Sequence, residues 1–319
     1  MEKRKKYKLK KNVLYGTFIF LILIVLISMY GKQKYDEYNY KKTIEYKLIQ
    51  KGWSKKQANE LQKLYKDHIN DILKYRTNDN LIKLANEKYF LYKNLNDYLE
   101  YLKNNDDKSL KDVVAIINTH ANNEWYSLDF DTDTSLNERL IVNKFYHLSE
   151  EYSPEDIVNI SNKYAYDGNR MRQDAYEAFK SLWNDAYNDG IKFVINSSYR
   201  EYDKQLKIYE DYKNWYGQAK ADSQAARPGY SEHQTGLAID VFSTDNKLTG
   251  SFQESDGYKW LKDNAYKYGF IERYPEGKQY LTGYEFESWH WRYVGKDAAS
   301  VIQKENITYD EYYAYYIEK

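Results

Sequence analysis

The chain of 319 residues contains no cysteine. This absence excludes disulfide bonds, a thiol nucleophile, cysteine-ligated zinc, iron–sulfur clusters and a lipid-modified cysteine. Any bound metal must therefore use histidine and carboxylate ligands. An excess of one charge is also absent, because 48 Lys and Arg balance 48 Asp and Glu. A neutral chain lacks the overall basic field that attracts phosphates, so nucleic acid is not expected as a partner.

Long apolar runs are scarce, with one exception near the start of the chain. Residues 1–12 carry seven Lys and Arg against one Glu, a net charge of +6. Residues 13–30, VLYGTFIFLILIVLISMY, follow without a charged side chain. A helix of this length, at about 1.5 Å per residue, crosses most of a bilayer core. A cleaved signal peptide is the alternative, but its apolar core is usually shorter and Ser28-Met29-Tyr30 is a poor cleavage site. We therefore expect a single-pass membrane anchor.

The basic block sets the expected orientation of this anchor. Lys and Arg stay on the cytoplasmic side, so the N-terminus is expected inside and everything beyond Gly31 outside the cytoplasmic membrane. Residues 31–108 are polar, with apolar residues at helical spacing. Gly52 is typical of a helix end, and Ser54 with Gln57 predicts a capping box that opens the next helix. We expect a helical stalk here, with a small module that contacts a cell-wall polymer as the alternative.

From residue 109 the pattern changes to apolar strands and longer amphipathic helices, beginning with short apolar runs at 113–117 and 140–142. We expect one α+β domain over residues 109–305, with a small antiparallel sheet flanked by helices, and a tail without a readable role over 306–319. Helices are expected at 174–187, at 201–216 and from Ser255 to about Gly269, and strands at 192–196, 237–242 and 287–294.

Two short stretches carry residues that suit catalysis. In the stretch 231–240, SEHQTGLAID, Asp240 lies inside an apolar strand. A buried carboxylate without a partner costs several kcal/mol, so a cation, a metal or a hydrogen-bond network must meet it. In the stretch 287–293, ESWHWRY, strand alternation places Trp289 and Trp291 on the face opposite His290, and Glu287 near His290.

Together His233, Asp240 and His290 offer two imidazoles and a carboxylate. This ligand set suits one Zn²⁺ ion and leaves the fourth position of a tetrahedron for water. Glu287 beside such a metal would take a proton from that water and later deliver it to a leaving amine. From spacing alone, histidines that are hydrogen-bonded in the core stay an alternative. The remaining histidines, His68, His120 and His147, are interpreted as structural or surface residues.

Residues 191–294 resemble the VanY-type D-alanyl-D-alanine carboxypeptidases, zinc peptidases of the bacterial cell wall. Residues 197–200, SSYR, look like the family's substrate-arginine segment, residues 226–240, ARPGYSEHQTGLAID, like its first zinc motif, and residues 287–293 like its second. A weaker resemblance extends over roughly 110–305. Two departures stand out: Ser198 where the family often has Gly, and Glu201 where a small polar residue is common. They imply a narrower or more acidic approach to Arg200.

The resemblance implies a role for each candidate residue. By that resemblance, the zinc ligands are His233, Asp240 and His290, and Glu287 is the general base and acid. The resemblance also implies that Arg200 stabilises the carbonyl oxygen of the substrate. The peptide end of the substrate would be held by Gln205 and Ser231, and Trp289 would form a wall of the pocket. For Arg200 the alternative is a surface ion pair with Glu201 or Asp203, and for Gln205 a solvated helix face.

The resemblance and the apolar segment together imply a membrane-anchored, extracytoplasmic zinc metallopeptidase. Its expected reaction is removal of the C-terminal D-alanine from peptidoglycan stem peptides. The alternatives are an L,D-carboxypeptidase, an endopeptidase that cuts cross-bridges, or a module that binds cell-wall peptides without cleaving them. A purely structural zinc site would require a fourth protein ligand, and no further His or Cys lies near the two motifs.

Overall fold

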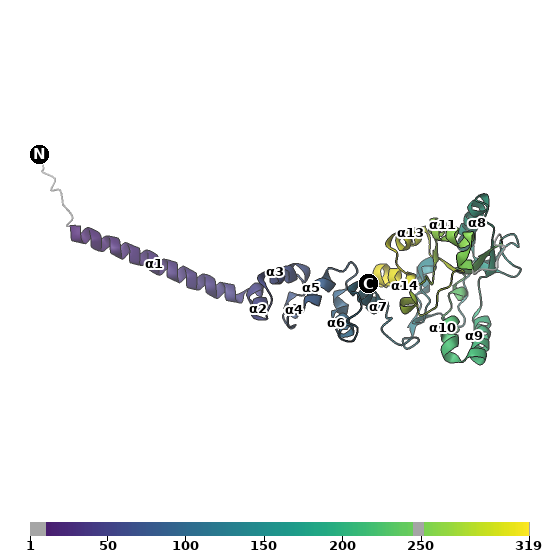
Figure 1. The fold of residues 1–319 in the computed structure, drawn as a ribbon, viewed down its shortest axis with the longest axis horizontal. Coiled ribbons are helices and arrows are strands. Elements are labelled where there is room, and N and C mark those ends of the chain that lie inside the picture. Colours follow the sequence, from purple (N-terminus) through teal and green to yellow (C-terminus); the bar gives the residue numbers. More distant parts are fainter. Residues whose placement is uncertain (1–10, 245–251, 319) are drawn as a thin grey trace. The chain divides into compact units, whose positions relative to one another are not determined.

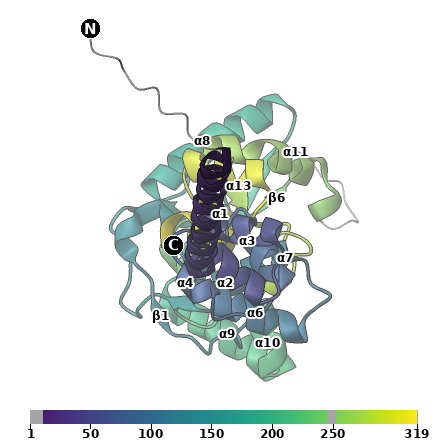
Figure 2. The same ribbon diagram turned by 90° about the vertical axis from the view of Figure 1, so that its left-hand side faces the viewer.

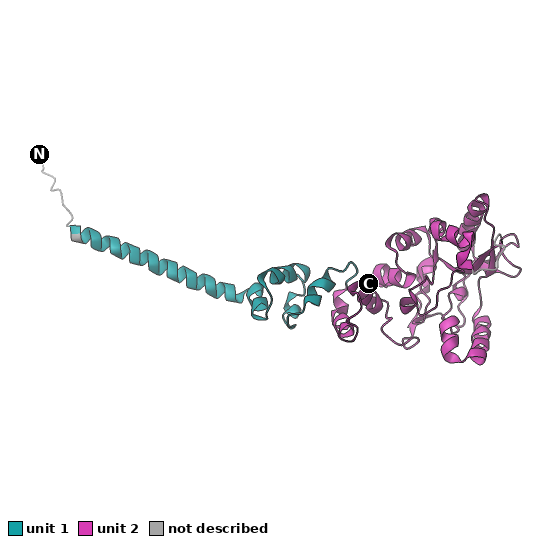
Figure 3. Ribbon diagram, viewed as in Figure 1, with its two compact units in different colours: residues 1–90 teal, residues 91–319 magenta. Residues whose placement is uncertain are grey.

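The computed structural model describes residues 11–244 and 252–318 (Figure 1). Residues 1–10, which hold most of the basic block, therefore lie outside the described residues. The chain divides into two compact units, residues 1–90 and residues 91–319 (Figure 3). Residues 91–108 thus group with the C-terminal unit, whereas the sequence pattern alone suggested a stalk up to residue 108.

The N-terminal unit begins with one long helix, α1 (Lys11–Lys42). Within it, the segment Val13–Lys42 has a mean hydropathy of 2.5 over its most apolar window, and none of that window is buried. Apolar side chains that are exposed over such a length, among the described residues, are typical of a helix surrounded by lipid. By length and composition, α1 is able to cross a membrane. A signal sequence near an N-terminus has the same length and composition, so these two properties do not distinguish an anchor from a signal sequence.

In the described part of this unit, four short helices follow α1: α2 (Ile44–Gln50), α3 (Lys55–Leu64), α4 (Ile69–Ile72) and α5 (Asp79–Ala85). The capping box predicted from Ser54 and Gln57 is confirmed, since the Gln57 amide donates to Ser54 Oγ and the Ser54 amide donates to Gln57 Oε1. Gly52, at φ +99°, follows the end of α2 as predicted. Buried apolar side chains such as Trp53 and Leu61 give the unit a small core.

The C-terminal unit opens with α6 (Leu95–Asn104) and α7 (Leu110–Asn118). The apolar run at 113–117 lies within α7 and is buried throughout. A helix buried on every side loses the polar face that would reveal its period, so such a run is not distinguishable from a strand by sequence. The run at 140–142 forms a buried loop. Two small strand pairs follow, parallel β1 (Phe130–Asp131) with β2 (Tyr146–His147) and antiparallel β3 (Ile157–Asn159) with β4 (Arg170–Arg172).

The central sheet has the strand order β5-β6-β8-β7, and every neighbouring pair is antiparallel. Its strands are β5 (Phe193–Ser197), β6 (Ala238–Ser243), β7 (Phe270–Glu272) and β8 (His290–Tyr293). Helices α8 (Gln173–Asn188) and α11 (Asp256–Asn264) lie on one side of this unit, and α9 (Tyr202–Tyr216) and α10 (Gln218–Gln224) lie on the other (Figure 2). The predicted α+β fold with a small antiparallel sheet is confirmed.

The core of this unit joins one face of α8 to the sheet, through Phe179, Leu182, Ile239, Val241 and Trp291. The helices predicted at 174–187 and 201–216 form as α8 and α9. Ser255 caps α11 as predicted, by accepting a hydrogen bond from the Tyr258 amide at 3.0 Å. Short helix α12 (Gln279–Thr282) and helices α13 (Lys296–Glu305) and α14 (Tyr309–Tyr313) follow.

The C-terminal segment is more than a tail. All five residues of α14 are buried. Thr308 and Glu311 form a capping box at its start, with the Glu311 amide donating to Thr308 Oγ1 and the Thr308 amide donating to Glu311 Oε2. The segment therefore belongs to the folded unit that contains the central sheet.

Candidate metal centre

Strand pairing brings Asp240 and His290 together. Asp240 on β6 lies directly opposite His290 on β8 in the antiparallel register. Directly opposed residues of adjacent strands point to the same face of a sheet, about 5 Å apart at Cβ. Their side chains accordingly meet, with 3.2 Å between His290 Nδ1 and Asp240 Oδ1.

A tight turn delivers the third side chain. His233 lies in a short 3₁₀ helix, Glu232–Thr235, which ends at Gly236 with φ +70°. A Cβ atom on Gly236 would stand 2.5 Å from Ile157 Cδ1 and 3.0 Å from Arg172 Cγ, so both the conformation and the space require glycine. The turn places His233 Nε2 at 3.5 Å from Asp240 Oδ1.

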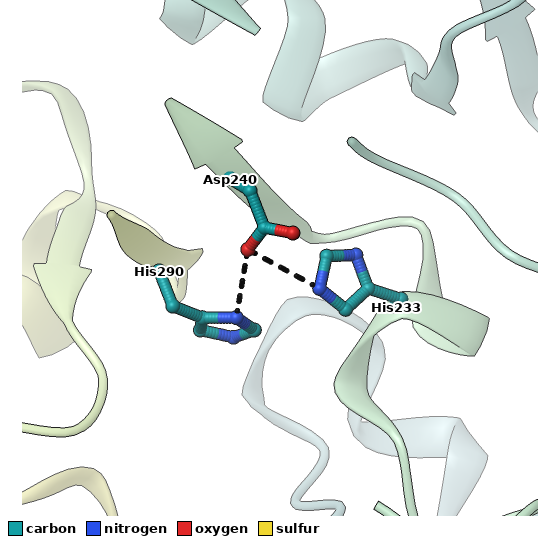
Figure 4. A group of neighbouring side chains, drawn as sticks. All are labelled: His233, Asp240 and His290. Atoms are coloured by element: carbon teal, nitrogen blue, oxygen red, sulfur yellow. Dashed lines mark hydrogen bonds and ion pairs between the residues drawn. The ribbon is translucent and has the colours of Figure 1, made fainter. Parts of the chain in front are cut away.

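The three side chains converge on one point (Figure 4). Their ligand atoms all lie within 4.8 Å of one another. Figure 4 shows the Asp240 carboxylate between the two imidazole rings, with one oxygen directed at both. The structure therefore assembles the ligand set that the two sequence motifs predict, from a turn and two adjacent strands.

The outer contacts of both histidines fit a metal ion. His233 Nδ1 lies 2.7 Å from the carbonyl oxygen of Ser198, which only accepts, so Nδ1 carries the proton and Nε2 is free to bind a metal. His290 Nε2 faces Glu232 Oε2 at 3.5 Å, which leaves His290 Nδ1 toward Asp240. An imidazole whose second nitrogen donates to a carbonyl or carboxylate is the usual arrangement at zinc sites.

Glu287 stands beside this cluster. Its Oε2 lies 3.7 Å from His290 Nδ1, as predicted from their spacing, and its side chain is 17% exposed. Burial raises the pKa of the Glu287 carboxyl to about 7, although His290 lowers it and Asp240 raises it further. A carboxyl group near neutrality is able both to accept a proton and to return it.

One pocket, of about 190 Å³, contains all eight predicted site residues. They are Arg200, Gln205, Ser231, His233, Asp240, Glu287, Trp289 and His290, together with Ile208, Tyr212, Gln224, Ala225, Ala226, Glu232, Tyr274 and Tyr284. Ser231 is buried, whereas Trp289 is 37% exposed and precedes strand β8. Trp291 packs instead in the core. The prediction that both tryptophans lie on the face opposite His290 is therefore wrong for Trp289, which lies before the strand and lines the pocket with His290.

Two buried polar atoms in this pocket lack hydrogen-bond partners among the described residues: Arg200 Nε and Gln205 Oε1. Glu201, the alternative partner of Arg200, instead pairs with Arg170 at 2.9 Å. Gln205 is only 2% exposed, so a solvated helix face is excluded for it. Unsatisfied donors and acceptors that line a pocket are typical of groups that bind a polar ligand.

Sequence reasoning singled out none of the three tyrosines that line the pocket, of which Tyr274 and Tyr284 lie near His290. The ring centroid of Tyr274 lies 4.9 Å from that of His290 and 4.8 Å from that of Tyr284. Burial raises the pKa of both phenols well above the ordinary value, so both are neutral hydrogen-bonding groups at neutral pH. With 38 tyrosines in the chain, no spacing signal distinguishes these two.

A buried charge network behind His290 was missed as well. Glu232 Oε1 accepts hydrogen bonds from Arg273 Nε at 2.8 Å and Arg292 Nη1 at 3.0 Å. Arg273 Nη1 also donates to Asp310 of α14 at 2.6 Å. Burial alone would raise the pKa of Glu232, but the two guanidinium groups outweigh it and hold that pKa well below the ordinary value. Glu232 is thus an anion that supports His290.

Two histidines outside the two motifs, His120 and His147, contact carboxylates elsewhere. His120 Nε2 lies 3.2 Å from Glu318 Oε1, and His147 Nδ1 lies 3.2 Å from Asp129 Oδ1. Neither lines the pocket that contains His233, Asp240 and His290. This agrees with their interpretation as structural or surface residues.

Comparison with known proteins places this fold and site in a family. The sequence profile of VanY, described as D-alanyl-D-alanine carboxypeptidase, matches residues 168–296, which include every candidate site residue. The chain is 42% identical over 179 residues to the putative carboxypeptidase YodJ of Bacillus subtilis, a match that covers 54% of this chain and 66% of that protein.

Two solved structures are also similar. The LdcB LD-carboxypeptidase, from a study of peptidoglycan recognition, has 40% sequence identity and a TM-score of 0.55, over 58% of this chain and 89% of that one. A vancomycin-resistance D,D-pentapeptidase VanY, solved in complex with Zn(II), has 32% identity and a TM-score of 0.49, over 55% of this chain and 98% of that one.

Fold, ligand set and pocket define a metallopeptidase domain of the carboxypeptidase type. The chain belongs to the VanY family, described as D-alanyl-D-alanine carboxypeptidase.

Proposed function

We propose that this protein is a zinc carboxypeptidase that removes the C-terminal D-alanine from peptidoglycan stem peptides ending in D-Ala-D-Ala. The observation that carries the proposal is the pocket in which His233, Asp240 and His290 converge beside Glu287 and beside Arg200, whose Nε has no hydrogen-bond partner among the described residues. The VanY family supports the substrate class.

His233, Asp240 and His290 would hold the metal through Nε2, Oδ1 and Nδ1. When bound there, zinc would supply Lewis acidity to the scissile carbonyl and lower the pKa of a coordinated water. The two histidines are held in the required tautomers by Ser198 O and Glu232, so these ligands are oriented before the metal arrives.

Glu287 would move the protons. Its carboxylate takes one proton from the attacking water as the oxygen adds to the carbonyl carbon. The carbon–nitrogen bond then breaks, and the same proton passes from Glu287 to the leaving amine of D-alanine. Glu287 is placed for both transfers because it lines the same pocket as the three candidate ligands, with its Oε2 3.7 Å from His290 Nδ1.

Arg200 would stabilise the charge that develops on the carbonyl oxygen. Its guanidinium lines the pocket with Nε unpartnered among the described residues, so the donor is free for the substrate. Gln205 and Ser231 would hold the peptide end, since Gln205 Nε2 is fixed by the Ala226 carbonyl at 2.8 Å while its Oε1 has no described partner. Trp289 would form the outer wall.

A second candidate is an L,D-carboxypeptidase, which removes D-alanine from a tetrapeptide. The similarity to the LdcB LD-carboxypeptidase, at 40% identity, favours it. The metal ligands and Glu287 serve either reaction equally, because both break a bond before a terminal D-alanine. The difference lies in which residue precedes the bond.

We also propose that the protein is anchored in the cytoplasmic membrane. Helix α1 would anchor the chain, with the N-terminus in the cytoplasm and the catalytic unit outside, because the basic residues precede the apolar segment. Peptidoglycan lies on that outer side, so this orientation brings the pocket to its substrate.

The test is a cleavage assay on the full chain in detergent. The protein is incubated with a pentapeptide ending in D-Ala-D-Ala and with the matching tetrapeptide, with and without a zinc chelator, and products are read by mass spectrometry. We expect loss of one D-alanine from the pentapeptide, abolished by the chelator and by Glu287→Ala. Cleavage of the tetrapeptide alone would establish the L,D reaction, and cleavage of neither would contradict both.

A further inference from the structure

A row of exposed aromatic side chains continues outward from the pocket along α9. Trp215 is 67% exposed and Tyr216 is 60% exposed, at the C-terminal end of the helix. Large aromatic groups at such exposure are costly in water and mark binding surfaces more often than other surface residues do. We call Tyr212, Trp215 and Tyr216 the aromatic ridge.

The ridge is continuous with the pocket. Tyr212 lines the pocket, and its ring centroid lies 6.2 Å from that of Trp215 and 5.8 Å from that of Tyr216. On the same helix, Gln205 and Ile208 also line the pocket. Residues at positions 205, 208, 212 and 215 recur at intervals of three or four, which places them along one face of α9.

The length of this face matches a stem peptide. From Gln205 to Trp215 the helix rises about 15 Å, at about 1.5 Å per residue. An extended peptide covers about 14 Å in four residues, at up to about 3.5 Å per residue. In a pentapeptide stem, four residues lie between the terminal D-alanine and the amino sugar that carries the peptide. A substrate whose C-terminus lies at Gln205 therefore brings its sugar to the level of Trp215.

We propose that the aromatic ridge binds the amino sugar of the glycan strand to which the stem peptide is attached. The apolar C–H face of a pyranose ring stacks on an exposed indole or phenol ring, while its hydroxyl and N-acetyl groups stay in water. Rigid aromatic side chains suit this contact because they lose little conformational freedom on binding. This inference rests on the proposed function, because it assigns a further part of the same substrate.

The experiment compares two substrates that differ only in the sugar. The full chain in detergent receives the free pentapeptide and the same pentapeptide attached to a muramyl disaccharide. We expect the wild type to have a KM about tenfold lower for the sugar-bearing substrate. In Trp215→Ala/Tyr216→Ala that preference should vanish through a raised KM on the sugar-bearing substrate, with kcat and the KM for the free pentapeptide unchanged. The matched control is Tyr187→Ala, which removes a 55% exposed ring stacked on Trp183 at 4.9 Å.

A wild type without sugar preference, or a preference that survives in the double variant, would overturn the inference. An equal loss on both substrates would also overturn it, by assigning the ridge to the peptide. If the wild type cleaves neither substrate, the proposed function fails separately. In that case calorimetric binding of the two ligands to Glu287→Gln decides the inference, with the same tenfold preference expected and its absence contradicting the ridge.

Discussion

The polar groups on the two sides of the His290 ring differ in how completely they are hydrogen-bonded. On the pocket side, His290 Nδ1 meets Asp240 at 3.2 Å and Glu287 at 3.7 Å, beside an arginine whose Nε has no partner among the described residues. On the other side, His290 Nε2 faces Glu232, whose carboxylate is fully enclosed and paired with two arginines. One side leaves polar groups unsatisfied, and the other satisfies them.

The difference indicates that the groups on the pocket side serve the reaction, whereas the groups behind the His290 ring hold the structure in place. Unsatisfied groups at a pocket cost stability and persist where a ligand or a reaction uses them. A buried ion network that is fully paired fixes geometry, and removing one member leaves an uncompensated charge. Changes on the pocket side should therefore reduce the rate at constant stability, and changes on the rear side should reduce stability or metal affinity.

The largest effect is expected from Glu287→Gln. The amide keeps the shape but is unable to accept or return a proton, so kcat on the pentapeptide should fall about 10³-fold. The midpoint of denaturant unfolding should not fall, because the substitution removes a carboxylate that burial disfavours. A variant that loses activity only in proportion to lost folded protein would contradict the catalytic role.

Arg200→Lys should cost about 10²-fold in kcat/KM. Lysine keeps the charge but lacks the planar fork, so its hydrogen bond to the developing oxyanion is misplaced. Steady-state kinetics should show the loss mainly in kcat. An unchanged kcat with a raised KM would instead assign Arg200 to ground-state binding.

Asp310→Asn tests the rear side and should reduce the free energy of unfolding by about 3 kcal/mol, since it breaks a buried ion pair with Arg273. Asp211→Asn is the matched control, because it removes an exposed pair with Lys207 and should change stability by less than about 1 kcal/mol. Denaturant unfolding followed by tryptophan fluorescence measures both. Equal losses in the free energy of unfolding would show that the buried ion pair stabilises the protein no more than the exposed one.

Glu232→Gln should weaken zinc binding about 10- to 100-fold, because it removes the charge that orients His290 through Nε2. Asp310→Asn lies in the same network without contacting His290, so its zinc affinity should stay near that of the wild type in the folded protein. Competition with a chromophoric chelator measures both affinities. An equal loss of zinc affinity in the two variants would contradict the claim that direct contact with His290 is what matters.

How far the sequence predicts this molecule depends on whether the signal is local. Helices α8 and α9, the caps at Ser54 and Ser255, and strands β5 and β6 follow from nearby residues. The convergence of His233, Asp240 and His290 was predictable because both motifs resemble those of a known family, whereas their spacing alone left core histidines as an alternative. The network was not, because Glu232, Arg273 and Asp310 are separated by about 40 residues each and carry no pattern in common.

The C-terminal segment failed to stand out for a similar reason. Its tyrosines and acidic residues have the composition of a solvent-exposed tail, and only tertiary contacts bury them. Asn143 Nδ2 donates to Asp310 Oδ1 at 2.8 Å across 167 residues. A carboxylate that pairs over such a distance is identified by the fold and not by its neighbours in the sequence.

The most direct test of the central claim is the zinc content of the purified full chain, measured by mass spectrometry after loading and dialysis. The wild type and Glu287→Gln should retain zinc, whereas His233→Ala and Asp240→Ala should lose it, because these two remove ligand atoms of the converging set. Zinc retained equally by Asp240→Ala, or none retained by the wild type, would contradict the account.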